Sequence, residues 1–492
     1  MSALKKFAGQ TAIYGLSTIA SRILNFFLTP IYTTVYPPLV YGIFTKLYAW
    51  ASIFNAIMAF GMETTFFRYL NKKEGQKETV YSTTFFVIAF ITLLFLTTAY
   101  LFIHPVAAWI QEGKQTSLED YTTYIKYFIL ILAVDALSVI PFARVRAEGR
   151  PGRYAIIKFI NVLSFILLNL FFIFAIPFII KNNLLFADEL GGWYKTEWIG
   201  YVFISNLVAS ILTFILLLPE ILKLKFNIDR KLLAEMFTYS WPILVANLSF
   251  IVNETSDKIF LGHLLPADIS EQQVGIYGAC SKIAIFMSIF IQAFRLGAEP
   301  FFFSSAKDKN AKSTYAVIMS YFIIALTLIF VGLVANIEIL KYFIGEAYWS
   351  GLNVVPVLLL GYLSLGIYMN LSVWYKLSDQ TKYGLYISGA GAILTITLNI
   401  IFIPLWGFMA SACISLAVYL TMMFLSYLWG QKHYPIPYTV KKDLLYILIA
   451  AGLVFISFVI FKRNIIAGNI LFILFGIFIV YREKDNLKIL LK

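Results

Sequence analysis

The chain has few of the residues on which soluble enzymes and metal proteins depend. Only 13% of its 492 residues are charged, three are histidine and two, Cys280 and Cys413, are cysteine. The histidines are scattered and no histidine or cysteine spacing suggests a metal site, so neither a metal nor a bound cofactor is expected. Both cysteines fall within apolar stretches, where they are expected to pack as small hydrophobic side chains rather than form a disulfide.

Apolar residues make up 60% of the chain and are gathered into fourteen stretches, each long enough to cross a bilayer. Backbone polar groups in hydrocarbon must be paired internally, so these stretches are predicted to be helices. The sequence therefore predicts an all-α polytopic membrane protein with about fourteen transmembrane helices. The predicted spans are approximately 9–35, 40–61, 79–103, 121–143, 158–180, 199–219, 240–262, 274–298, 314–336, 351–374, 384–403, 408–429, 444–461 and 466–481.

The connecting loops are short, none longer than about 20 residues, which leaves no room for a folded catalytic domain on either side of the membrane. No Ser/His/Asp set or carboxylate pair stands out. A membrane glycosyltransferase or glycan polymerase would need a site on a sizeable loop. The chain is therefore not expected to be an enzyme.

Most of the 39 Lys and Arg residues lie at the termini and in the even-numbered loops, which share one side of the membrane. The positive-inside rule places both termini in the cytoplasm. The net charge of +13 then reflects topology and attraction to anionic lipid heads, and nucleic acid is not expected as a partner. The expected location is the bacterial cytoplasmic (inner) membrane.

The chain resembles itself at an offset of about 235 residues. The segment 41–44 (YGIF) matches 274–277 (VGIY), and Gly61-Met62-Glu63 matches Gly297-Ala298-Glu299. Six spans separate the copies, so both insert with the same orientation. This predicts two six-helix lobes related by a parallel repeat, residues 1–235 and 236–430, with two further helices in 431–492. Transporters built in this way hold their substrate between the lobes near mid-membrane.

Several charged residues fall inside predicted spans, where each costs roughly 2.5–3.5 kcal/mol on insertion scales. Arg22 shares a polar stripe with Thr18 and Asn25 along the first helix, which suits the wall of a water-filled cavity. The alternative is that Arg22 extends to the outer surface. The candidate substrate-binding residues are Arg22, Lys46, Asp257, Lys258, Lys282 and Arg295. A local pair between Arg295 and Glu299 would give Arg295 a purely structural role.

Three acidic residues are candidates for coupling to Na⁺ or H⁺: Asp135, Glu254 and Asp257. Asp135 lies near the middle of its span, where a buried interhelical hydrogen bond is an equal alternative. Glu254 and Lys258 are four residues apart and could neutralise each other.

Several fixed cations in one cavity suit an anionic cargo, because Arg binds phosphate through bidentate hydrogen bonds and Lys adds charge. A diphosphate head carrying a polar sugar could enter between the lobes. A long lipid tail could remain outside, along the last two spans.

Four segments carry recognisable motifs: Ser21-Arg22-Ile23-Leu24, 144–151 (RVRAEGRP), Ser256-Asp257-Lys258-Ile259 and 293–303 (AFRLGAEPFFF). These motifs resemble those of the bacterial lipid-linked oligosaccharide flippases of the Wzx type, in the polysaccharide-exporter (MOP, MATE-like) superfamily. The resemblance covers nearly the whole chain, including the number of spans.

The resemblance implies alternating access that moves a polyprenyl-diphosphate-linked oligosaccharide, such as a lipopolysaccharide O-antigen unit, from the inner to the outer leaflet. It implies cavity roles for Arg22, Asp257 and Arg295, and less directly for Lys258, where relatives commonly carry Arg. Membrane lipids, and polysaccharide-assembly proteins, are the expected partners of a monomer. The alternatives within the superfamily are a lipid II flippase and a cation-coupled multidrug antiporter.

Overall fold

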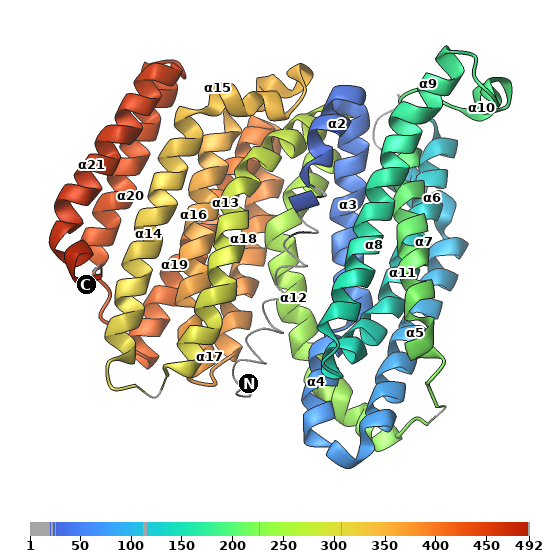
Figure 1. The fold of residues 1–492 in the computed structure, drawn as a ribbon, viewed down its shortest axis with the longest axis horizontal. Helices are drawn as coiled ribbons and strands as arrows, with labels where there is room; N and C mark the ends of the chain where they lie inside the picture. Colours follow the sequence, from blue (N-terminus) through green and yellow to red (C-terminus); the bar gives the residue numbers. More distant parts are fainter. Residues whose placement is uncertain are drawn as a thin grey trace. The chain divides into compact units, whose positions relative to one another are not determined.

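The chain is helical throughout the residues that the computed structural model describes, which are 20, 23–24, 26–111, 116–225, 227–306 and 308–490. No strand occurs among them. Figure 1 shows long helices running roughly antiparallel within each part of the chain. This is the architecture expected where every backbone N–H and C=O must find its partner inside its own segment.

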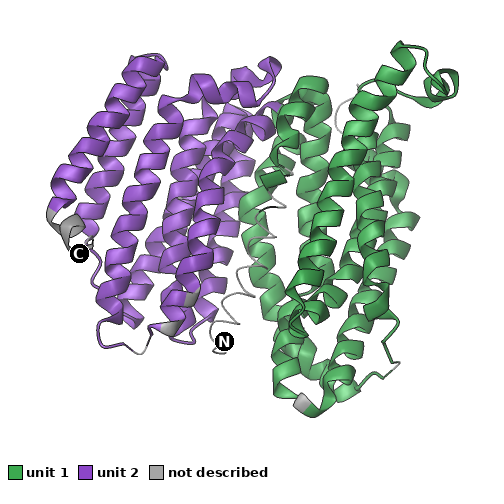
Figure 2. Ribbon diagram, viewed as in Figure 1, with its two compact units in different colours: residues 1–275 green, residues 276–492 purple. Residues whose placement is uncertain are grey.

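The chain divides into two compact units, Met1–Gly275 and Ile276–Lys492 (Figure 2). The boundary falls inside one helix, α13 (Ser270–Ser304). It differs from the predicted lobe boundary at residue 235 because α12 (Arg230–Leu264) packs against helices of unit 1. The predicted lobes were defined by the internal sequence repeat, whereas the two units are defined by how densely their residues pack. The lobes therefore stay a prediction.

Unit 1 is built around α7, which contacts α5, α11, α3 and α8, while α12 packs on α3. Its helices are α2 (Leu28–Val35), α3 (Pro38–Ala59), α4 (Met62–Lys72), α5 (Lys77–Leu101), α6 (Ile103–Ile110), α7 (Leu118–Ala147), α8 (Pro151–Leu170), α9 (Ile176–Lys181), α10 (Ala187–Trp193), α11 (Gly200–Ile221), α12 and the first residues of α13, with short turns at Glu74–Gln76 and Phe171–Ala175. Pro151 begins α8, a position at which proline's missing N–H costs no hydrogen bond.

Unit 2 is built around α16 and α14, with α19 packed on α16 and α18 on α19. Its helices are the remainder of α13, α14 (Ala311–Ala335), α15 (Ile337–Leu340), α16 (Val354–Leu371), α17 (Val373–Leu377), α18 (Lys382–Trp406), α19 (Phe408–His433), α20 (Val440–Phe455) and α21 (Ile465–Leu490), with short turns at Lys341–Phe343, Glu346–Gly351 and Ile456–Ile460.

The last two helices, α20 and α21, both pack on α14. Reciprocal amide hydrogen bonds of 3.2 and 3.0 Å join Asn336, at the end of α14, to Asn469 of α21. Glu483 of α21 accepts hydrogen bonds from Lys442 and Tyr446 of α20. Polar pairs of this kind fix the register of helices that lipid would otherwise allow to slide.

Twelve of the helices in the described part of the chain are long and apolar enough to cross a membrane. They correspond to predicted spans 2–6 and 8–14, so the count of fourteen is not confirmed. Most of predicted span 1 lies outside the described residues. Predicted span 7 lies in α12, a 35-residue helix whose apolar character is broken by Asn247, Glu254 and Asp257.

The cysteines follow the prediction only in part. Both are free, and Cys280 is fully buried, with its Sγ 3.4 Å from the carbonyl oxygen of Tyr348. Cys413, by contrast, is exposed on α19. A thiol facing outward from an apolar helix is compatible with lipid, because sulfur is only weakly polar.

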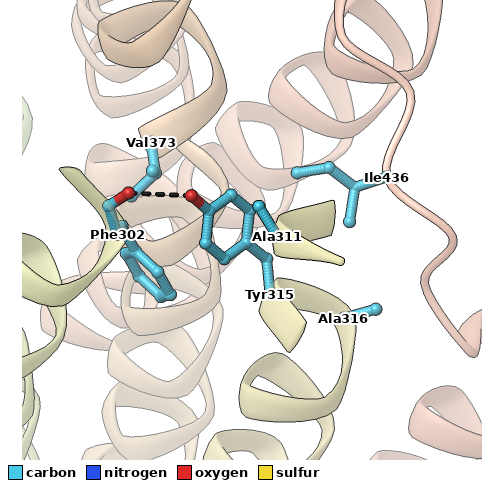
Figure 3. Packing of buried hydrophobic residues seen from close by; sticks show 6 residues of the cluster. All are labelled: Phe302, Ala311, Tyr315, Ala316, Val373 and Ile436. Atoms are coloured by element: carbon cyan, nitrogen blue, oxygen red, sulfur yellow. Dashed lines mark hydrogen bonds between the residues drawn. The ribbon is translucent and has the colours of Figure 1, made fainter. Parts of the chain in front are cut away.

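Figure 3 shows the buried cluster that joins the end of α13 to α14 and α17 in unit 2. The hydroxyl of Tyr315 donates a 2.7 Å hydrogen bond to the carbonyl oxygen of Phe302, and the two rings meet edge to face. Val373 and Ile436 close the cluster from α17 and from the segment before α20. The bond satisfies a backbone acceptor near the end of α13 and orients the ring that fills the cluster.

The two glycines matched by the repeat lie against each other in unit 1. A Cβ on Gly42 would overlap the carbonyl oxygen of Glu271 and lie 3.1 Å from the backbone nitrogen of Gly275. A Cβ on Gly275 would overlap the carbonyl oxygen of Pro38 and lie 2.9 Å from the nitrogen of Gly42. The two contacts are reciprocal across the repeat. Only glycine permits α3 and α13 to cross at this distance.

We expect Gly42→Ala and Gly275→Ala each to destabilise the protein by at least about 1–3 kcal/mol, because backbone rather than a flexible side chain blocks the added methyl group. The thermal unfolding midpoint of the purified protein in detergent measures this. Gly452→Ala in α20 is the matched control, since no atom lies within 4 Å of its Cβ position. Equal midpoints for Gly275→Ala and Gly452→Ala would contradict the close crossing.

Candidate functional site

Lys46 is buried beside the glycine crossing and has a complete set of partners. Its side chain is fully buried on α3, and its Nζ donates a 2.8 Å hydrogen bond to the carbonyl oxygen of Ile110 at the end of α6. The Glu271 carboxylate, 2% exposed in the first turn of α13, lies 3.7 Å from Nζ. The hydroxyl of Tyr121 on α7 donates a hydrogen bond to Glu271, and the Tyr121 ring lies near the ammonium group. Four helices therefore converge on one buried ion pair.

The sequence singled out Lys46 as a substrate ligand but not Glu271, whose place at the start of an apolar span was the available signal. Attraction between the two charges offsets part of the cost of removing each from water, and the hydrogen bonds from Tyr121 and to Ile110 offset more. The arrangement gives Lys46 a structural function at this position. Its predicted contact with cargo stays a prediction.

A second charged group lies on α12 in unit 1. The Lys258 ammonium is 2.8 Å from the carboxylate of Asp257, whose side chain is 7% exposed. The same ammonium lies 3.4 Å from the carbonyl oxygen of Glu254. Lys258 therefore contacts both acidic residues that the sequence analysis named in this span, Asp257 through its carboxylate and Glu254 through its backbone.

The two carboxylates matched by the repeat have equivalent partners in their own units. In unit 1, Glu63 in the first turn of α4 pairs with Arg146 in the last turn of α7. In unit 2, Glu299 near the end of α13 pairs with Lys376 of α17, at 2.5 Å. The carboxylate follows span 2 or 8 and the cation follows span 4 or 10. The internal repeat thus includes an ion pair whose basic member the sequence alignment did not reveal.

Arg295 makes the local pair that was its structural alternative, with Nε 3.5 Å from the carboxylate of Glu299. Its side chain is nevertheless 41% exposed. The guanidinium therefore keeps donors that this pair does not use.

The second predicted span ends in unit 1 at a break between two helices, beside an open cleft. Phe60 and Gly61 both have left-handed backbone angles, with φ of 47° and 66°, and they separate α3 from α4. The cleft encloses about 240 Å³ and is lined by Ala56, Ala59, Gly61, Glu63, Thr64, Asn247, Phe250 and Ile251. Discontinuous helices beside polar cavities are a recurrent feature of transporter substrate sites.

Asp135 is held by neighbouring helices of unit 1. The groups that act on its carboxylate are the hydroxyl of Ser210 on α11 and the ammonium of Lys158 on α8. The nearby Tyr48 accepts a 2.7 Å hydrogen bond from Asn206. Asp135 therefore has polar neighbours on two other helices, and both its structural role and its ion-coupling role stay predictions.

Two further residues were predicted to bind substrate, Arg22 and Lys282. Arg22 lies outside the described residues. Lys282 is half-buried on α13 in unit 2, whereas Lys46 and Lys258 belong to unit 1. A shared cationic patch therefore stays a prediction. Within the described part of the chain, no group of three His, Cys, Asp or Glu residues is placed to hold a metal ion.

Residues 7–296 match the family described as polysaccharide biosynthesis protein. That match covers more than half of the sequence. The chain belongs to this family. No match was found among the curated proteins.

Solved structures similar to the chain are transporters and flippases of low sequence identity. The lipid II flippase MurJ in an inward closed conformation is 15% identical with a TM-score of 0.68, over 97% of this chain and 100% of that one. An inward-facing multidrug resistance MATE transporter of the MOP superfamily is 12% identical, with a TM-score of 0.62 over 86% and 97%. The MATE multidrug transporter DinF-BH is 15% identical, with a TM-score of 0.62 over 88% and 97%. These likenesses establish the fold of a multi-pass membrane flippase or transporter.

A further charged network, which the sequence analysis did not predict, surrounds Glu220 at the end of α11. Its buried side chain lies 2.8 Å from Arg150 and 3.1 Å from Arg153, at the family-like 144–151 segment. The neighbouring Glu220 carboxylate raises the pKa of the Arg150 guanidinium above its ordinary value. Arg144 adds pairs with Glu78 and Glu148. The basic motif therefore ties α5, α7, α8 and α11 together.

Lys46→Met is expected to destabilise the protein by about 3–5 kcal/mol, because it leaves the buried Glu271 carboxylate without its cation. The double variant Lys46→Met with Glu271→Gln should recover most of that loss. Chemical unfolding in detergent of both single variants and the double variant gives the coupling energy. A double variant as unstable as the sum of the singles would show that the two side chains are not coupled.

Proposed function

We propose that the protein is a flippase that moves polyprenyl-diphosphate-linked oligosaccharide from the cytoplasmic to the outer leaflet of the bacterial inner membrane. The cargo is a repeat unit of lipopolysaccharide O-antigen or of another surface polysaccharide. Membership of the polysaccharide biosynthesis family is the observation that carries this proposal. The MurJ-like fold over nearly the whole chain supports it.

The charges at membrane depth favour an anionic cargo. Arg295 keeps unused donors and Lys282 is half-buried in a span, while Arg22 adds a third cation from the sequence. Cations of this kind hold a diphosphate while the glycan crosses in an aqueous cavity. The polyprenyl tail stays in lipid. The apolar outward surface of α20 and α21, which includes Leu448 and Ile466, supports a path for it there.

The transport cycle that we propose is alternating access by a monomer, with both termini in the cytoplasm and no bound cofactor. A gradient of Na⁺ or H⁺ would act through Asp135, Glu254 or Asp257. Lipid II is the second candidate cargo, because MurJ is a lipid II flippase. A cation-coupled multidrug antiporter is the third candidate, supported by the MATE likeness. Polysaccharide-assembly proteins are the proposed partners.

The decisive experiment measures transbilayer movement of a polyprenyl-diphosphate oligosaccharide in proteoliposomes. The intact protein should move it, and Arg22→Ala should lower the rate at least about tenfold by removing a diphosphate ligand. Arg482→Ala, at the exposed end of α21, is the matched control and should keep the rate.

Equal rates in Arg22→Ala and Arg482→Ala would retain the function but remove Arg22 from the site. Movement of lipid II alone would favour the second cargo. Absence of any lipid movement, together with cation-driven dye export, would replace the proposal by the antiporter.

Coupling has its own test. If Asp135 binds the coupling ion, Asp135→Asn removes the charge while keeping the side chain's shape, so transport should lose its response to an imposed Na⁺ or H⁺ gradient. Ser210→Ala, which keeps the carboxylate, should retain that response. Initial rates with and without each gradient provide the measurement, and an unaltered response in Asp135→Asn would exclude Asp135 as the coupling residue.

A further inference from the structure

A small pocket in unit 2 brings Arg295 of α13 together with Met369 and Asn370 of α16. It is open on one side, and the enclosed part has room for about one water molecule. Phe294 and Phe322 stack along its wall, with ring centroids 4.0 Å apart. The pocket is therefore an apolar recess whose lining residues include three with polar side chains, Arg295, Glu299 and Asn370.

Two hydrogen-bond donors at this pocket have no oxygen acceptor among the described residues. Asn370 is only 8% exposed, and its Nδ2 has no hydrogen-bond partner there. The guanidinium of Arg295 directs Nη1 at the sulfur of Met369, 3.8 Å away. A thioether is a weak acceptor, and a buried amide donor without a partner costs about 1–3 kcal/mol. Both residues line the pocket, so an oxygen atom that enters it would supply the kind of acceptor that these donors lack.

The charge at the pocket selects the chemistry of that oxygen. Glu299 gives one carboxylate oxygen to Lys376, and its other oxygen lies 3.5 Å from Nε of Arg295. Two cations therefore share one carboxylate, which leaves a net positive charge. The stacked rings exclude water from one side, and this strengthens the attraction for an anion.

We propose that Arg295 and Asn370 form an oxyanion subsite that takes one oxygen of a phosphate or carboxylate group of the cargo. This inference rests on the proposed function and deepens it. The cargo offers that chemistry from two sources: its diphosphate, or the carboxylate of an acidic sugar. The rest of the anionic group stays at the open mouth of the pocket.

The test compares the intact protein with Asn370→Leu and Asn370→Asp in lipid nanodiscs. Binding is measured for uncharged polyprenol, polyprenyl diphosphate, and polyprenyl diphosphate carrying either a neutral or a uronic-acid-containing disaccharide. Asn370→Leu should weaken binding of the anionic lipid about tenfold, and Asn370→Asp should weaken it further through repulsion. Neither should alter binding of polyprenol.

Controls separate this effect from misfolding. Ser364 is also buried on α16, and its hydroxyl donates a hydrogen bond to a carbonyl oxygen of the same helix. The Ser364→Ala variant should therefore bind every lipid as the intact protein does. Asn370→Leu should unfold at the same temperature as the intact protein or a higher one, because it removes an unpartnered donor.

Weaker binding of every diphosphate lipid identifies the diphosphate as the bound group, and weaker binding of the uronic-acid lipid alone identifies the carboxylate. Unchanged affinities in both variants would overturn the subsite and leave the pocket to a structural water. The failure of the proposed function is distinguishable: the intact protein would move no glycolipid across proteoliposomes, yet anion binding would still depend on Asn370.

Discussion

A charge placed at membrane depth must meet an opposite charge or a strong hydrogen-bonding group, since hydrocarbon offers neither. The protein meets this requirement with short-range pairs in each unit. Lys46 and Glu271 are buried together, Asp257 holds Lys258, and Glu299 holds Lys376. The first and third pairs each join two helices and fix them relative to each other within a unit, whereas Asp257 and Lys258 are adjacent residues of α12.

The close crossing of α3 and α13 at two glycines explains how Lys46 and Glu271 come within reach of each other. Gly42 and Gly275 let the α3 and α13 backbones approach, and this approach brings Glu271 within reach of Lys46, one turn along α3. Larger residues would separate the helices and leave each charge in an apolar setting. The close helix crossing and the ion pair therefore depend on each other, and the glycines that allow the crossing come from the two copies of the same short motif.

Some polar groups lack a strong partner of this kind, and such groups are the ones that can bind a charged substrate. Arg295 is paired only weakly with Glu299 and faces a thioether, and Asn370 is buried without a partner in the described part of the chain. The break between α3 and α4 at Phe60 and Gly61 borders an open cleft. The ion-paired groups hold the scaffold, whereas Arg295 and Asn370 are suited to a ligand.

The sequence by itself determined the all-helical membrane class, the position of twelve spans and the repeat, because hydropathy and segment order are local properties of the chain. It also placed Lys46 and Arg295 within segments that the structure shows as helices long and apolar enough to cross a membrane. Only the tertiary structure decided their partners. Glu271 lies 225 residues from Lys46 and Lys376 lies 77 from Glu299, and no periodicity within one helix encodes which residue of another helix it will touch. That choice is made by packing, through close approaches such as the one at Gly42 and Gly275.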